Sequence, residues 1–423
     1  VGSGAGSASL KGVDNVAIGM NAMTALAGDV AANGGIRNIA IGSQAMGAVN
    51  PGTHDLALAD DNIAIGYQAL KGASFVDQDK DLKNNIAIGS YALTSTGTNA
   101  QNGIVAIGYQ ALAALTSGAA NTAIGAMRQA GNAVYYNTFI GSSSGSGDWS
   151  GGAHSNTAVG AATMTGVMTA ASIGNVAVGR DTLNALTTGA SNTAVGYLAG
   201  DAITTDSRVV AIGHGAYSAN VTTNGHDSTA TNGSGNMAIG YKSMHGLNDV
   251  NAFRNTMVGY ETMLDCGGAN ASDNTASGFQ ALKSINNNSA DANTAIGSKA
   301  LTALTTGASN VAVGYQAGDA ITSGGKNVCI GTSAGSALVD DIKNVFIGFE
   351  AGLASTANNV VAIGHQAMKA ASVQPGSIAI GDSALTALTS GTANVGIGQN
   401  ALMAVGGVAN NTAVGTYCLQ TTT

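Results

Sequence analysis

One short motif recurs along the whole chain and constrains the fold more than any other feature. It consists of Asn, an apolar residue or Thr, Ala, Ile or Val, and Gly, as in NVAIG at 15–19. We count 22 copies, whose glycines lie at 19, 42, 66, 89, 108, 125, 141, 160, 179, 196, 213, 240, 259, 278, 297, 314, 331, 348, 364, 381, 398 and 415. Neighbouring copies are mostly 16 to 19 residues apart. Repeats of this length predict a solenoid, in which each copy contacts its neighbours.

The motif has the alternation of a β-strand with two apolar faces. The residue before Gly is Ile or Val in 21 of the 22 copies, and the residue before that is Ala in 17. Because successive side chains of a strand point to opposite sides, both faces are apolar, which is typical of parallel sheets. A coil of about 17 residues has a perimeter of roughly 55 Å, enough for two or three short strands. A helical repeat is disfavoured because Gly and Thr-Gly interrupt each segment that could form one.

We therefore predict an all-β chain that forms a repetitive parallel β-solenoid (β-roll) of about 22 coils, mostly of 16 to 19 residues. At about 4.8 Å per coil it would be a rod of roughly 100 Å. We divide it into an N-terminal lead-in at 1–14, coils with long corner insertions at 15–100, and compact coils at 101–423 with one long insertion at 219–235. The insertions at 27–37, 47–61, 72–84 and 219–235 could carry a binding surface, and inert spacers would explain them almost equally well.

The Asn and Gly of the motif have a structural explanation that needs no catalysis. Identical Asn side chains stacked about 4.8 Å apart can hydrogen-bond along a ladder. Gly marks a bend or a point where the next backbone comes too close for a Cβ atom. We assign this structural ladder to the motif residues, represented by Asn15, Gly19, Asn38, Gly42, Asn62, Gly66, Asn192, Gly196, Asn310 and Gly314.

The two apolar faces also predict partners. Only one face can point into a coil, and we expect the Ala face, with Ala194, Ala211 and Ala312 among its members, to form an exposed stripe that packs against other chains. The functional unit is then an oligomer. Further protein should continue the stack at one or both ends, because parallel coils leave unpaired strand edges there.

Composition excludes several other classes of partner. The net charge of −8 with no basic cluster argues against nucleic acid, and no apolar stretch is long enough to insert into a membrane. The three cysteines (Cys266, Cys329, Cys418) form no CxxC, and the six histidines have no HxxxH spacing, so we expect no metal, cofactor or disulfide. His214 and His365 are expected at the surface or a corner.

Acidic clusters offer little support for catalysis. Asp77, Asp79 and Asp81 alternate as in a calcium loop, but the Gly and Glu that such a loop needs are missing. We interpret this segment, and the one with His54, Asp55, Asp60 and Asp61, as solvated loops. A polysaccharide hydrolase needs paired carboxylates. With 23 acidic residues spread over 423, and Trp149 as the single Trp for stacking sugars, we expect no catalytic residues and no enzyme.

The repeats resemble a known family of fibres. NTAVGYLAG at 192–200 and NVAVGYQAG at 310–318, each preceded by LTTG, resemble the shaft repeats of phage tail-fibre proteins. The Asn-x-Ala-Ile-Gly element is similar to the head repeats of trimeric autotransporter adhesins. The resemblance implies a parallel homotrimer of β-rolls, outside the cell or on a virion, used for attachment to a cell-surface glycan or protein receptor. A phage-type fibre shaft is our first hypothesis, a bacterial surface adhesin the second, and a polysaccharide-degrading solenoid enzyme the third.

Overall fold

The chain forms two compact units, Val1–Arg208 and Val209–Thr423. The computed structural model describes all residues except 1, 7–11, 25–34, 50–58, 73–80, 96–100, 127–129, 132–133, 150, 219–234, 247–251, 267–270, 286–289, 371–373, 388–390, 406, 408 and 423. The described residues form strands and turns and no helix.

Each copy of the motif contributes one three-residue strand. In the first unit these strands are β1 (Val16–Ile18), β2 (Ile39–Ile41), β4 (Ile63–Ile65), β6 (Ile86–Ile88), β8 (Val105–Ile107), β11 (Thr122–Ile124), β14 (Thr138–Ile140), β16 (Thr157–Val159), β17 (Val176–Val178) and β18 (Thr193–Val195). In the second unit they are β19 (Val210–Ile212), β20 (Met237–Ile239), β21 (Thr256–Val258), β22 (Thr275–Ser277), β23 (Thr294–Ile296), β24 (Val311–Val313), β25 (Val328–Ile330), β26 (Val345–Ile347), β27 (Val361–Ile363), β28 (Ile378–Ile380), β29 (Val395–Ile397) and β31 (Thr412–Val414).

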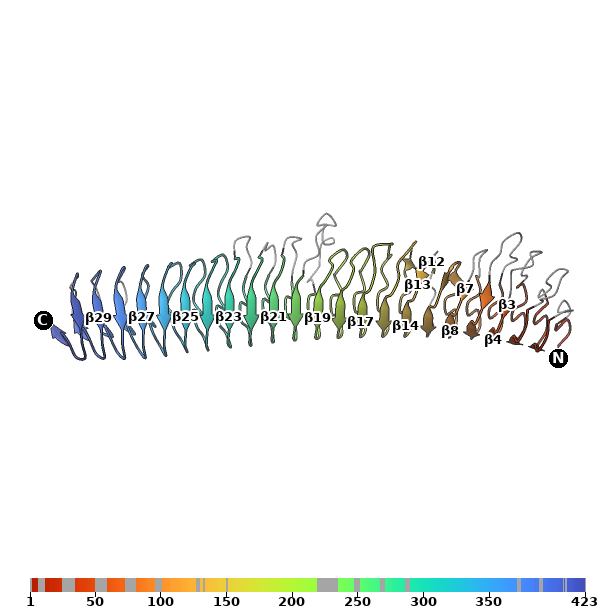
Figure 1. Cartoon of the computed structure of the whole chain (residues 1–423), viewed down its shortest axis with the longest axis horizontal. Coiled ribbons are helices and arrows are strands. Elements are labelled where there is room, and N and C mark those ends of the chain that lie inside the picture. The colour runs from red at the N-terminus through yellow and green to blue at the C-terminus, as the bar shows by residue number, and fades with distance from the viewer. Residues whose placement is uncertain are drawn as a thin grey trace. The chain divides into compact units, whose positions relative to one another are not determined.

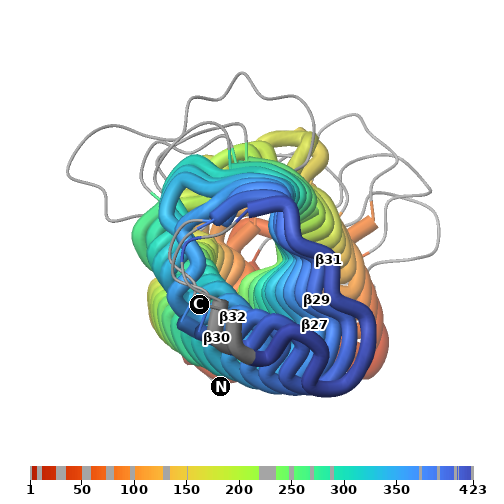
Figure 2. The backbone as a smooth tube through the Cα atoms, turned by 90° about the vertical axis from the view of Figure 1, so that its left-hand side faces the viewer, coloured from red at the N-terminus to blue at the C-terminus, as the bar shows by residue number. Residues whose placement is uncertain are grey.

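Within each unit, the motif strand of one coil pairs in parallel with that of the next, without offset. Between β24 and β25, for example, Val311 lies beside Val328 and Val313 beside Ile330. Figure 1 shows these strands side by side along each unit. In Figure 2, the coils of the second unit, coloured green to blue, follow nearly the same path. The predicted all-β parallel β-solenoid is confirmed.

Shorter parallel strands form on other sides of some coils. In the first unit, a five-stranded sheet contains β3 (Ala59–Asp60), β5 (Leu82–Lys83), β7 (Gln101–Asn102), β10 (Gly118–Ala119) and β13 (Val134–Tyr135). A three-stranded sheet contains β9 (Ala114–Leu115), β12 (Ala130–Gly131) and β15 (Asp148–Trp149). In the second unit, β30 (Ala404–Val405) pairs with β32 (Thr421–Thr422). Consecutive coils therefore also pair away from the motif strands.

The interior of a coil holds several apolar side chains, both small and large. The middle residue of the motif strand points inward, and Ala194, Ala211 and Ala312 are fully buried. The Leu or Met four residues after the motif Gly, such as Leu301, is buried with it. The Ile and Val residues on either side of the Ala point outward, so that Ile296 is 44% exposed. Our expectation that the Ala face lies outside was therefore wrong, because the interior beside the Leu or Met is narrow and in most coils the small Ala fills the space that remains.

The two inward Phe residues are compensated within the same coil. Phe346 takes this position in β26, and the coil has Gly352 where most coils have Leu or Met. A Cβ atom on Gly352 would lie 2.7 Å from the Phe346 ring. Phe139 and Gly145 show the same exchange in the first unit, where a Cβ atom on Gly145 would lie 2.5 Å from the Phe139 ring. The pair conserves the filled volume, as a close-packed core requires.

Candidate functional site

The outward side of the motif strands is an apolar surface, which we call the aliphatic face. It consists of the two residues that flank the inward residue of each motif strand, which are mostly Ile and Val, with Thr before the inward residue in eight strands. The more exposed of those that precede Gly are Ile18, Ile124, Ile140, Val178 and Val195 in the first unit, and Ile212, Val258, Ile296, Ile330, Ile380, Ile397 and Val414 in the second, all at least 36% exposed. Contiguous apolar surfaces on soluble proteins mark interaction sites.

The Asn ladder holds the strands of this face in register. Oδ1 of Asn15 accepts hydrogen bonds from the backbone N–H of Asn38 at 2.8 Å and from its Nδ2 at 3.2 Å. Asn38 in turn accepts both donors of Asn62 at 3.0 Å, and its own Nδ2 donates to the carbonyl of Ala59 at 2.6 Å. The same backbone bond joins Asn192 to Asn175 and Asn310 to Asn293, each at 2.9 Å. The amide side chains thus hydrogen-bond one corner of each of these coils to the same corner of the next coil.

The motif glycines combine the two constraints that the sequence suggests. Gly19, Gly42, Gly66, Gly196 and Gly314 have φ values of 129°, 132°, 131°, 138° and 139°. A Cβ atom on Gly314 would lie 2.5 Å from the carbonyl oxygen of Gly331, and one on Gly42 would lie 2.5 Å from that of Gly66. A side chain at these positions would meet both a disfavoured backbone conformation and the backbone of the next coil.

Sequence reasoning missed one part of the ladder. Val209 stands where the ladder would have Asn, so Asn236 in the next coil lacks its usual amide neighbour. Nδ2 of Asn236 donates instead to the hydroxyl oxygen of the buried Tyr217 at 3.1 Å. The available signal was a Tyr four residues after the motif Gly, a position that most copies fill with Leu or Met.

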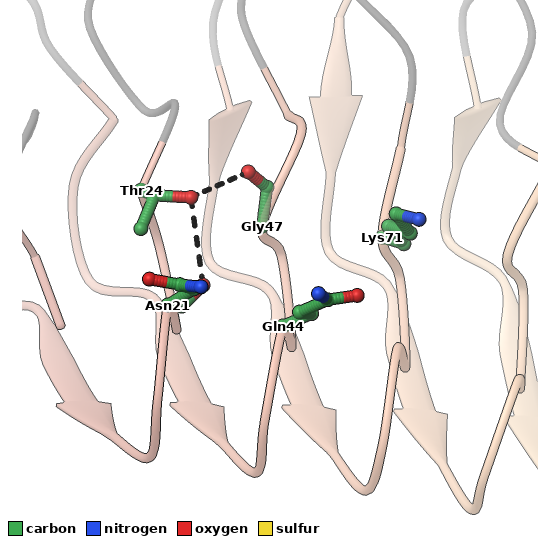
Figure 3. Close-up of a pocket in the computed structure, with 5 residues that line it drawn as sticks. All are labelled: Asn21, Thr24, Gln44, Gly47 and Lys71. Carbon is green, nitrogen blue, oxygen red and sulfur yellow. Dashed lines mark hydrogen bonds between the residues drawn. The ribbon is translucent and has the colours of Figure 1, made fainter. Parts of the chain in front are cut away.

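A polar hollow of about 290 Å³ lies on the first unit, on the segments that follow the motif Gly (Figure 3). It is lined by Asn21, Thr24, Gln44, Gly47 and Lys71. The Thr24 hydroxyl donates to the carbonyl of Gly47 at 2.8 Å. These groups can hydrogen-bond a ligand, and the lining side chains include no carboxylate, imidazole or thiol.

Three of the acidic residues considered above, Asp60, Asp61 and Asp81, lie among the described residues. Each forms a hydrogen bond or an ion pair within the fold. Oδ1 of Asp60 accepts a backbone N–H at 2.9 Å. Asp61 pairs with Arg37 at 2.6 Å, and this hydrogen bond lowers the pKa of the Asp61 carboxyl. Asp81 pairs with Lys83 at 3.0 Å. His54, Asp55, Asp77 and Asp79 lie outside the described residues.

Two of the three cysteine thiols are buried. Cys266 and Cys329 are buried, and burial raises the pKa of the Cys329 thiol to about 12. Burial also raises the pKa of Cys266, whose Sγ lies 3.3 Å from the carbonyl of His245. Cys418 is half-buried, and all three cysteines are free thiols. Among the described residues, no group of three His, Cys, Asp or Glu side chains could hold a metal ion.

Two histidines and the single Trp contact other rings. His214 and His365 are exposed, and their rings pack against Tyr241 and Phe349 with centroids 5.3 and 5.4 Å apart. Trp149 is 1% exposed and packs edge-on against Phe139 at 4.8 Å. Because its ring is buried, it cannot stack on a sugar at the surface.

The proposed binding insertions at 27–37, 47–61, 72–84 and 219–235 lie largely outside the described residues. No helix in the described part of the chain has the length and apolar character needed to cross a membrane. Comparison of the sequence with models of known protein families finds no match, and comparison with curated proteins finds none either.

Proposed function

We propose that this chain is the shaft of a structural fibre or adhesin, which assembles through its aliphatic face and holds or forms an attachment module. The observation that supports this proposal is the outward orientation of the Ile and Val residues of the motif in both units. The resemblance to phage tail-fibre repeats favours a parallel homotrimer on a virion, and a bacterial surface adhesin would use the same scaffold. In either case the shaft works outside the cell.

Burial of the aliphatic face provides the driving force for assembly. Apolar surface removed from water stabilises a complex by about 25 cal/mol per Å². Solenoid coils are evenly spaced at about 4.8 Å, so parallel copies bring equivalent coils to the same height along the whole contact. Rotation about a shared axis then closes the assembly and leaves no copy with an uncovered face.

A matched pair of variants tests this proposal in the full chain. Ile296→Glu with Ile330→Glu places charges on the aliphatic face, at residues that are 44% and 36% exposed. Val339→Glu with Ile342→Glu places them off the motif strands, at residues that are 45% and 38% exposed. We expect light scattering to give three times the 41.1 kDa chain mass for the unmodified protein and the control, and a smaller mass for the first variant.

Circular dichroism should show the same β-structure in all three proteins, because the substituted residues point to solvent. A stable monomer of the unmodified protein at micromolar concentration would overturn the proposal. Equal masses for the two variants would show that the aliphatic face is not the contact.

A further inference from the structure

A second exposed column runs beside the aliphatic face, formed by the residue directly after each motif Gly. In the second unit it begins with four consecutive rings, those of His214, Tyr241, Tyr260 and Phe279. Their centroids are 5.3, 4.9 and 5.4 Å apart, and the last two contacts are stacked with interplanar angles of 19° and 20°. Because the Tyr260 and Phe279 rings are stacked, Tyr260 covers one face of Phe279.

After Phe279 the column alternates between rings and hydroxyl residues. The next four members are Ser298, Tyr315, Thr332 and Phe349. Backbone hydrogen bonds between successive coils hold these residues in register. The N–H of Lys299 donates to the carbonyl of Phe279 at 2.8 Å, and that of Gln316 to Ser298 at 3.0 Å. In the same way Ser333 donates to Tyr315, and Glu350 to Thr332, each at 2.9 Å. Successive rings of this segment are therefore two coils apart, or about 9.6 Å.

Two slots result from this alternation. Phe349 stacks on His365 of the following coil, at 5.4 Å and 12°, so its other face is turned toward Thr332. Phe279 stacks on the preceding coil, so its other face is turned toward Ser298. Tyr315 stands between the two, 51% exposed. In the register of the column, one slot therefore lies between the positions of Phe279 and Tyr315, over Ser298, and the other between those of Tyr315 and Phe349, over Thr332.

The first unit shows that such a slot has room for a six-membered ring. Tyr67, Ser90 and Tyr109 follow the motif Gly in three successive coils and repeat the alternation. The ring of Tyr91 contacts both flanking rings edge-on, with centroids 5.2 and 6.3 Å apart and interplanar angles of 89° and 86°. In the slots of the second unit, the residues equivalent to Tyr91 are Lys299 and Ser333, which carry no ring.

We propose that each slot binds one pyranose ring of an uncharged saccharide. The mid-plane of a slot is about 4.8 Å from each aromatic ring, whereas carbon atoms in contact are about 3.5 to 4 Å apart. A flat aromatic ligand would leave a gap, while a puckered pyranose reaches both rings with the C–H groups on its two faces. The hydroxyls of Ser298 and Thr332 and the amide of Gln316 supply the few polar groups that orient such a ligand. This inference rests on the attachment role proposed above and assigns it a ligand class.

The test uses the full chain in its assembled form, with maltohexaose, cellohexaose and chitohexaose as probes and saturation-transfer NMR as the readout. We expect at least one probe to bind, and Tyr315→Ala to weaken binding at least tenfold because it opens both slots. Tyr109→Ala is the matched control, since this residue occupies the same column, is 57% exposed and borders a slot that is already filled. It should leave binding unchanged. Tyr91→Ser should empty the slot in the first unit and add a binding site.

The other outcomes separate this inference from the assembly proposal. Failure of all three probes, or equal binding by the Tyr315→Ala and Tyr109→Ala variants, overturns the saccharide slots even if the protein is a trimer. If the protein is a monomer, binds a probe and loses this binding in the Tyr315→Ala variant, the slot proposal stands and the trimer proposal is wrong. If Tyr315→Ala changes the mass by light scattering and no probe binds, the slots hold part of another copy and the saccharide proposal is wrong.

Discussion

Asn310 accepts two hydrogen bonds from Asn327, one from the backbone N–H at 3.0 Å and one from Nδ2 at 3.1 Å. Asn327 also donates from Nδ2 to the carbonyl of Asp341 at 2.8 Å. Both amide side chains are buried, so each bond replaces a contact with water. Buried polar groups are costly to leave unpaired, which makes this ladder a means of fixing the register between coils.

Asn310→Ala should destabilise the second unit by about 3 kcal/mol, because it removes the acceptor of the Asn327 backbone N–H and of one Nδ2 hydrogen, while Nδ2 keeps its bond to Asp341. Asn310→Ser should cost about half as much, since a Ser in the ladder keeps one acceptor: Oγ of Ser377 accepts the backbone N–H of Asn394 at 3.2 Å. Urea unfolding of both variants measures the difference. Equal losses would show that the ladder bonds contribute little.

Gly314→Ala should be far more damaging than Gly376→Ala, although both replace a Gly with positive φ. A Cβ on Gly314 would lie 2.5 Å from a backbone oxygen, whereas one on Gly376 would meet no atom within 4 Å. We expect a loss of about 4 kcal/mol or failure to fold for the first, and about 1 kcal/mol for the second. Thermal unfolding followed by circular dichroism compares them. Similar melting temperatures would refute the close approach of the two backbones.

Phe346 and Gly352 should be strongly coupled. Gly352→Leu alone would clash with the Phe346 ring, and Phe346→Ala alone would leave a cavity costing about 3 kcal/mol or more. Together they recreate the Ala and Leu pair found in other coils, where Leu301 and Leu385 adopt φ values of 48° and 51°, close to the 61° of Gly352. The double variant should be more stable than either single variant in a denaturation cycle. If the stability losses of the two single variants simply added in the double variant, Phe346 and residue 352 would not share the same volume.

Asp201 should make the stability of the first unit depend on pH. Burial raises the pKa of its carboxyl to about 6, and its buried Oδ1 has no hydrogen-bond partner. Because the folded pKa exceeds the unfolded value of about 3.9, the contribution of Asp201 to stability is greatest below pH 4, falls as the pH rises from about 4 to 6, and does not change above that.

After allowance for partial exposure, the fall for Asp201 should be at most about 2 kcal/mol, and Asp201→Asn should abolish it. Asp319 has the equivalent place in the near-repeat at 301–323, where burial also raises the pKa but a hydrogen bond to Ser336 opposes the shift. Asp319→Asn should therefore change the pH dependence less. Urea unfolding at pH 4 and pH 8 gives the comparison, and an unchanged profile for Asp201→Asn would contradict the assignment.

Much of the architecture could be read from the repeat because its physics is local. The alternation around Ala312 defines a three-residue strand, and the Asn and Gly that flank it mark the two corners in one copy after another. Features that depend on neighbouring coils were harder to predict. The role of Tyr217 in place of a ladder Asn required knowing which side chains share a corner, and the slots beside Tyr315 required the spacing of rings on successive coils.

The sequence by itself determined that the chain forms a parallel β-solenoid with apolar residues on both sides of each motif strand. It did not determine which side is the interior, since Ala312 and Val313 are both apolar and period-two alternation is symmetric between the faces. Tertiary structure decided this, because the inward residue must share a narrow coil with a Leu or Met from the next segment of the chain. In most coils Ala packs beside that side chain, and the larger Ile or Val residues face outward and are available for assembly.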